Sequence, residues 1–106
     1  EFIHPRGAQV LEDLGFYGAL KAAGAVDVDG FTVRERADGR CVELPYADVP
    51  GQRSQGLAVH HKTLVRVMRQ VVRQRPQVDL LEGWVIKDVI RGFGDRITGV
   101  VLTGPD

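Results

Sequence analysis

The sequence predicts a mixed α/β or α+β fold that combines two helices, a β-hairpin and a C-terminal β-meander. Three observations carry this prediction. Apolar residues recur at helical spacing in residues 5–23 and again in residues 62–74. Two segments in which apolar and polar residues alternate flank the Asp-Gly pair at residues 38–39, which is typical of a tight turn. A last pair of strand-like segments surrounds a turn at residues 92–95 (GFGD), so helices and strands follow one another along the chain.

The size and composition are those of a small globular protein. The 106 residues are 43% hydrophobic and 26% charged, which is ordinary for a folded domain, and we expect residues 1–106 to form a single segment. Fourteen basic residues balance fourteen acidic ones, so the net charge gives no reason to expect nucleic acid as a partner. The one cysteine excludes an internal disulfide. With no secretory signal pattern visible, we expect a cytoplasmic setting.

The first helical region is residues 5–23, and a break is expected near Gly15. Pro5 suits the first turn of a helix, where its missing N–H would be unpaired anyway. Gly24 suits the end, where a left-handed residue often terminates a helix. Glycine inside a helix costs about 1 kcal/mol relative to alanine. We therefore expect one helix followed by a short second piece.

A hairpin comes next, formed by residues 31–36 and 41–44 around the Asp-Gly turn. Cys41 falls within the second strand and has no visible activating partner, so a buried or half-buried structural thiol is expected. Residues 45–56 (PYADVPGQRSQG) contain two prolines and two glycines, and this composition is typical of a loop.

A short strand at residues 57–59 is expected to lead into the helix at 62–74, whose apolar residues form a narrow stripe. Pro76 ends this helix. Residues 78–82 (VDLLE) are mostly apolar, and a strand there would complete a βαβ arrangement. The remaining residues, 84–103, are predicted to form the meander.

Two features near predicted helix starts stand out as candidate ligand contacts. Arg6 lies in a first helical turn, where a cation opposes the helix dipole unless a negative group is nearby. A bound phosphate would supply that group; the alternative is a solvent-exposed charge. His60 and His61 would point to opposite faces of a strand, which disfavours a shared metal. They precede a helix and could reach an anion there, or they could simply be solvated.

Several other motifs are absent from the sequence or have a simpler interpretation. Neither a G-x-G-x-x-G motif nor a Walker A loop occurs, so the usual glycine-rich phosphate cradle is missing. The basic face of the second helix lacks interleaved aromatic residues and is typical of a solvated surface. We therefore expect no nucleic-acid partner; salt-sensitive binding would be its signature.

Four blocks of the sequence, in order, resemble one enzyme family. Residues 1–15 (EFIHPRGAQVLEDLG) resemble a conserved block of the FAD-dependent monooxygenases of the aromatic-hydroxylase fold. Residues 56–68 (GLAVHHKTLVRVM) resemble the next block, in which a short strand leads into a helix. Residues 78–83 and 95–102 are similar to the strand and meander that follow. The residues around Pro45 are more similar to the squalene-epoxidase and ubiquinone-hydroxylase members of the family.

The resemblance implies a partial Rossmann-like FAD-binding domain in a parent flavoprotein. Such a parent takes hydride from NADH or NADPH, reacts with oxygen, and hydroxylates or epoxidises an organic small-molecule substrate. Arg6 falls where the family places an arginine near the FAD diphosphate or ribose, and His61 falls where it more often has arginine or glutamine. Their neighbours Pro5 and Lys62 complete the implied cofactor-binding set, and no catalytic or metal residue is implied.

The resemblance also implies that this is an internal part of a longer chain. The G-x-G-x-x-G block expected before Glu1 and the later Gly-Asp block are both missing from the 106 residues. We therefore expect the isolated chain to be inactive and its own FAD binding to be doubtful, with any membrane association confined to the parent. The alternative is a non-enzymatic, self-associating α+β module that forms a homo-oligomer through exposed apolar surface.

Overall fold

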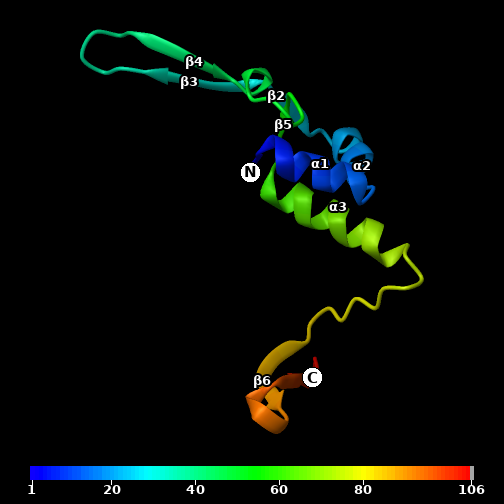
Figure 1. The fold of residues 1–106 in the computed structure, drawn as a ribbon. Coiled ribbons are helices and arrows are strands. Elements are labelled where there is room, and N and C mark those ends of the chain that lie inside the picture. The colour runs from blue at the N-terminus through cyan, green and yellow to red at the C-terminus, as the bar shows by residue number, and fades with distance from the viewer. Residues whose placement is uncertain (106) are drawn as a thin grey trace. The chain divides into compact units, whose positions relative to one another are not determined.

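The computed structural model describes residues 1–105, which divide into two compact units, Glu1–Arg75 and the residues from Pro76 onward. Residues 1–105 contain three α-helices and small sheets, so the mixed α/β class is confirmed (Figure 1). Every strand pairing among the described residues is antiparallel. The βαβ arrangement expected around the second predicted helix is therefore wrong.

The first unit contains a three-stranded sheet in the order β1-β5-β2. The strands are β1 (Phe2–Ile3), β2 (Val26–Val28) and β5 (Gly56–Ala58). Leu57 of β5 pairs with Ile3 on one side and Asp27 on the other. The strand predicted at 57–59 is thus confirmed with a shift of one residue, whereas β1 and β2 were not expected.

Two helices, α1 (Pro5–Asp13) and α2 (Tyr17–Ala22), occupy the first predicted helical region. The expected break is confirmed at Gly15, which has φ of 81°. Beyond it the N–H of Phe16 donates to the carbonyl of Leu11 at 2.7 Å, a bond that satisfies a carbonyl at the end of α1. Gly24, with φ of 98°, follows α2 as expected. The longest helix, α3 (His61–Arg73), confirms the second predicted helix.

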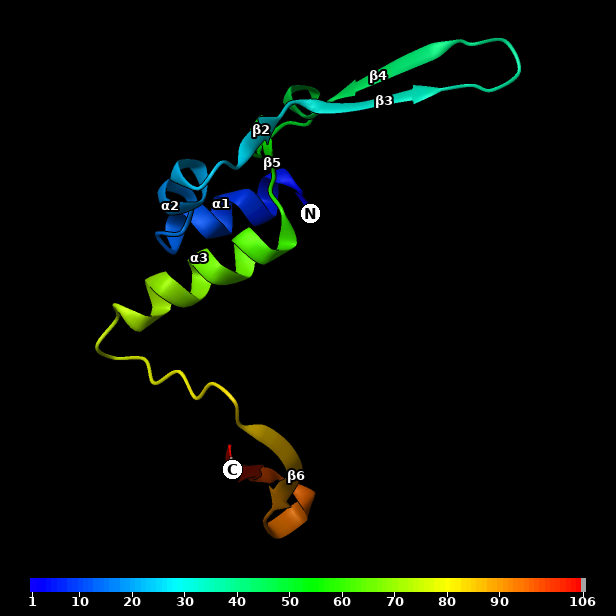
Figure 2. The ribbon, with the colours of Figure 1, turned by 180° about the vertical axis from the view of Figure 1, so that it is seen from behind.

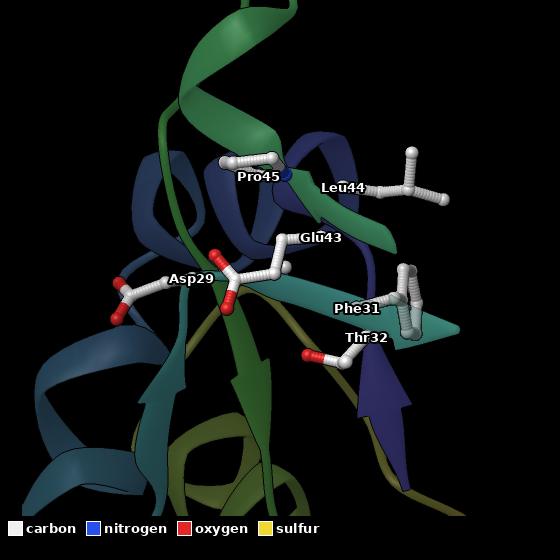
Figure 3. Close-up of a pocket in the computed structure, with 7 residues that line it drawn as sticks. Asp29, Phe31, Thr32, Glu43, Leu44 and Pro45 are labelled. Atoms are coloured by element: carbon white, nitrogen blue, oxygen red, sulfur yellow. The ribbon is translucent and has the colours of Figure 1, made fainter. Parts of the chain in front are cut away.

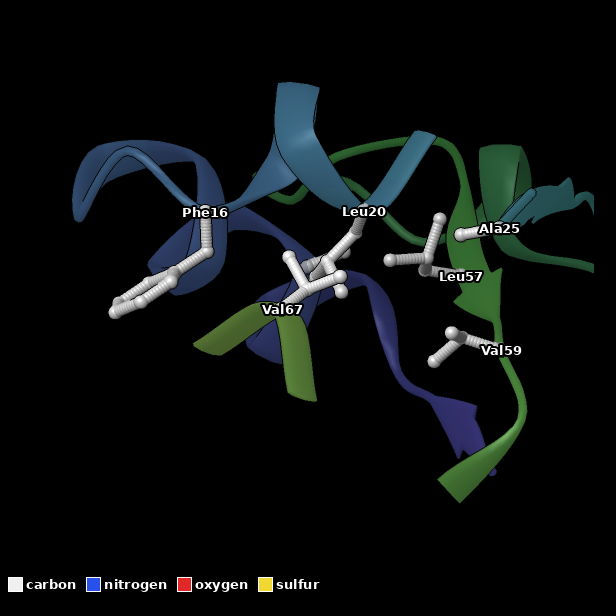
Figure 4. Packing of buried hydrophobic residues seen from close by; sticks show 7 residues of the cluster. Phe16, Leu20, Ala25, Leu57, Val59 and Val67 are labelled. Carbon is white, nitrogen blue, oxygen red and sulfur yellow. The ribbon is translucent and has the colours of Figure 1, made fainter. Parts of the chain in front are cut away.

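The core of the first unit lies where the three helices meet the sheet (Figure 4). Leu20 of α2 and Leu57 of β5 are fully buried, and Val67 of α3 packs into the same cluster. Burying one such leucine stabilises the fold by about 1.5–3 kcal/mol. The other buried members of the cluster are Ala8, Phe16, Ala25 and Val59.

A two-stranded ribbon, β3 (Gly30–Arg34) and β4 (Cys41–Pro45), confirms the predicted hairpin. Figures 1 and 2 show it extending away from the helices of its own unit. Cys41, at the start of β4, is exposed, so the expectation of a buried or half-buried thiol is wrong. The predicted loop after β4 contains one short 3₁₀ turn, Tyr46–Asp48.

The second unit is a long hairpin of β6 (Val85–Arg91) and β7 (Ile97–Thr103), joined by a 3₁₀ turn at Phe93–Asp95. It confirms the two strands and the turn predicted within residues 84–103, with Val89 paired to Val100, but they form a two-stranded hairpin instead of the expected meander. The strand expected at 78–82 is wrong: a strand needs a hydrogen-bonded neighbour, and this segment turns locally, with the N–H of Glu82 bonded to the carbonyl of Leu80. Within residues 1–105, none of the helices has the length and apolar character required to cross a bilayer.

Candidate functional site

The first predicted contact, Arg6, lies one residue inside the start of α1. Pro5 occupies the first helical position and is buried. The side chain of His4 caps the helix, because its Nδ1 accepts the backbone N–H of Arg6 at 3.4 Å. No acidic residue lies in the first turn of α1. The positive end of the helix dipole and the Arg6 cation therefore lie together without a carboxylate in that turn.

The second pair of predicted contacts begins α3. His60 is the N-cap residue, with an extended backbone and no side-chain capping bond, and His61 and Lys62 form the first turn. The Nδ1 atom of His61 lies 3.0 Å from a carboxylate oxygen of Glu1. This acidic neighbour would compete with an anionic ligand for the His61 ring.

The structure places these predicted residues in two different hollows. Arg6 lines a hollow of about 550 Å³ between α1 and the loop before β5. We call this the Arg6 hollow, and its lining residues are Arg6, Gln9, Val10, Gly51, Gln52 and Arg53. His61 and Lys62 instead line a groove of about 370 Å³ along α3, together with Val65, Arg66, Arg69 and Arg73.

The separation follows from the pairing of β1 with β5. These strands are antiparallel, with Phe2 opposite Ala58 and Ile3 opposite Leu57. Since α1 follows the end of β1 and α3 follows the end of β5, the two helices leave the pairing at opposite ends. The two hollows share no lining residue. The structure therefore does not bring Arg6 and His61 together in one hollow.

Arg53 was not expected as a site residue, yet it shares the hollow with Arg6. Its guanidinium carbon lies 4.2 Å from the centroid of the Tyr17 ring, and its Nη1 forms an ion pair with the carboxylate of Glu12. Only 18% of the Arg53 side chain is exposed. The one signal in the sequence was weak: Arg53 is the only basic residue in the loop of residues 45–56.

Tyr17 is itself held by a small polar network. Its hydroxyl donates to the carboxylate of Asp27, which also accepts a hydrogen bond from Lys21 Nζ at 2.8 Å. These two bonds, that from Lys21 first, lower the pKa of Asp27. Burial, followed by the bond to Asp27, raises the pKa of Tyr17. Both groups therefore keep their usual forms near neutral pH, and the ring under Arg53 is fixed in position.

Two residues that line the Arg6 hollow carry buried hydrogen-bond donors without a partner among the described residues. Gln52 Nε2 and Arg53 Nε are shielded from solvent, and neither has an acceptor among the described residues. Both groups are donors, and a buried donor without a partner costs about 1–3 kcal/mol. Gln9 differs, because its Nε2 already donates to Asp13 at 2.9 Å.

A further hollow of about 260 Å³ lies against the ribbon (Figure 3). Figure 3 shows the carboxylates of Asp29 and Glu43 on one side and the apolar side chains of Phe31 and Leu44 on the other. Asp29 already accepts a hydrogen bond from Gln55 at 2.8 Å. None of the predicted site residues lines this hollow. Among residues 1–105, no three histidine, cysteine, aspartate or glutamate side chains converge as a metal site would require.

Comparison with curated proteins finds a relative of named activity. No family model matches the sequence. The chain is similar to squalene monooxygenase of Mus musculus, with 27% identity over 107 residues. The match covers 93% of this chain and 19% of that protein, so the chain spans about a fifth of the relative's length. At this level the similarity indicates a distant relation to a monooxygenase.

Proposed function

We propose that this chain is a segment of the FAD-binding domain of a longer, flavin-dependent monooxygenase. The parent would hydroxylate or epoxidise an organic substrate using FAD, NAD(P)H and oxygen, within a Rossmann-like domain to which this chain contributes α1 and α3. The observation that carries the proposal is the similarity to squalene monooxygenase across 93% of the chain. The Arg6 cation at the start of α1, where the first turn holds no acidic residue, supports a phosphate-containing cofactor.

The residues present fit the anionic part of FAD. The diphosphate needs hydrogen-bond donors and positive charge, and Arg6 and Arg53 both line the Arg6 hollow. Arg6 is the principal proposed contact, and Pro5 sets the helix start that presents it. His61 and Lys62 line a separate groove along α3. We propose that this groove contacts a second region of the same cofactor.

The chain offers little to hold the flavin ring. In the bound state FAD would supply the redox chemistry, while the protein would bind and orient it. Large apolar ligand groups are usually enclosed by hydrophobic and aromatic side chains. The Arg6 hollow has one apolar side chain, Val10, and the α3 groove has Val65. The isolated chain is therefore proposed to be inactive, with the ring held by parts of the parent.

The test compares the 106-residue chain with the longer protein encoded by the same reading frame. Both are purified without added cofactor, and their visible absorption spectra are recorded. We expect a flavin spectrum from the longer protein and none from the 106-residue chain. A longer protein without flavin, even after incubation with FAD, would contradict the proposal. Stoichiometric, tight FAD in the short chain would contradict its description as an inactive segment.

The second candidate, a self-associating α+β module, is supported by one face of the β3–β4 ribbon. Phe31 pairs with Leu44 and Val33 with Val42, so the four side chains share a face. Each is more than half exposed. Sizing chromatography with and without FAD separates the two candidates. A concentration-dependent oligomer that ignores FAD would favour the module, whereas a monomer at all concentrations would exclude it.

A further inference from the structure

We draw no further inference here: the strongest candidate, the C-terminal β6–β7 hairpin, which exposes Val100 and Val101 on its two opposite faces, is an unpartnered sheet, and nothing among the described residues shows what covers it.

Discussion

The guanidinium of Arg53 lies over the ring of Tyr17, with 4.2 Å from the guanidinium carbon to the ring centroid. This contact ties the loop before β5 to the first residue of α2. Tyr17 is in turn bonded to Asp27 in β2, so the loop, a helix and a strand are linked by polar side chains. The same contact orients Arg53 in the Arg6 hollow.

Substitutions at Tyr17 separate its two contacts. Tyr17→Phe keeps the aromatic face under Arg53 but loses the hydroxyl bond to Asp27, and should cost about 1 kcal/mol of unfolding free energy. Tyr17→Leu also removes the cation–π contact, which adds about 0.5–1 kcal/mol. Urea denaturation of the two variants measures both steps. Equal stabilities of the two variants would show that the ring contributes nothing beyond its hydroxyl.

The lowered pKa of Asp27 makes stability depend on pH. A carboxyl whose pKa is lower in the folded state than in the unfolded state stabilises the fold when the pH is above its unfolded pKa. For Asp27 the reference value of the unfolded pKa is 3.8. That contribution is lost as the pH falls below this value toward the folded pKa. Asp27→Asn should therefore lose stability relative to wild type at pH 7, and the difference should shrink under acid.

Thermal or urea unfolding at a series of pH values measures this difference. Asp48→Asn, a change to a carboxyl outside the Tyr17 network, is the control and should leave the pH profile unchanged. An Asp27→Asn profile parallel to wild type down to acid pH would contradict the role assigned to Asp27.

Two glycines of the α2 region should respond to alanine in opposite directions. Gly18 lies within α2, and a Cβ there meets no atom within 4 Å, so Gly18→Ala should stabilise the fold by about 0.5–1 kcal/mol. At Gly24 space is also free, but φ is +98°. Gly24→Ala should therefore destabilise by about 1–2 kcal/mol. Urea midpoints compare the pair directly, and a shared sign would contradict the assigned backbone conformations.

The buried leucines should dominate the stability of the first unit. Leu20 and Leu57 are fully buried, and truncation of either to alanine should cost about 2–5 kcal/mol. Leu14→Ala is the matched control, because that side chain is 49% exposed, and its effect should be much smaller. Guanidinium denaturation monitored by circular dichroism provides the comparison. A cost at Leu14 equal to that at Leu57 would contradict the placement of the core.

Local signals in the sequence predicted most of the elements. Gly15 marked the helix break because a residue with positive φ interrupts the helix locally. The Asp-Gly pair likewise marked the hairpin turn, where Gly39 has φ of 71°. The strand expected at 78–82 failed, because an apolar run forms a strand only when a neighbouring strand pairs with it.

The sequence patterns could not predict contacts between residues that are far apart in the chain. Strand β1 has only two residues, too few to show alternation, and its partner β5 lies more than fifty residues away. That pairing also decides that Arg6 and His61 face different hollows. Arg53 was missed for the same reason: its contact with Tyr17 joins positions that no local spacing relates.

Flavin occupancy of the proposed longer parent protein tests the central claim most directly. The ratio of flavin to protein, from the visible absorbance after purification, is compared for wild type, Arg6→Gln and the control Arg36→Gln, an exposed arginine outside both hollows. We expect nearly one flavin per wild-type and Arg36→Gln protein, and a clearly lower ratio for Arg6→Gln. Absence of flavin from the wild-type longer protein would contradict its assignment as a flavin monooxygenase. Equal occupancy in all three would contradict the role of Arg6.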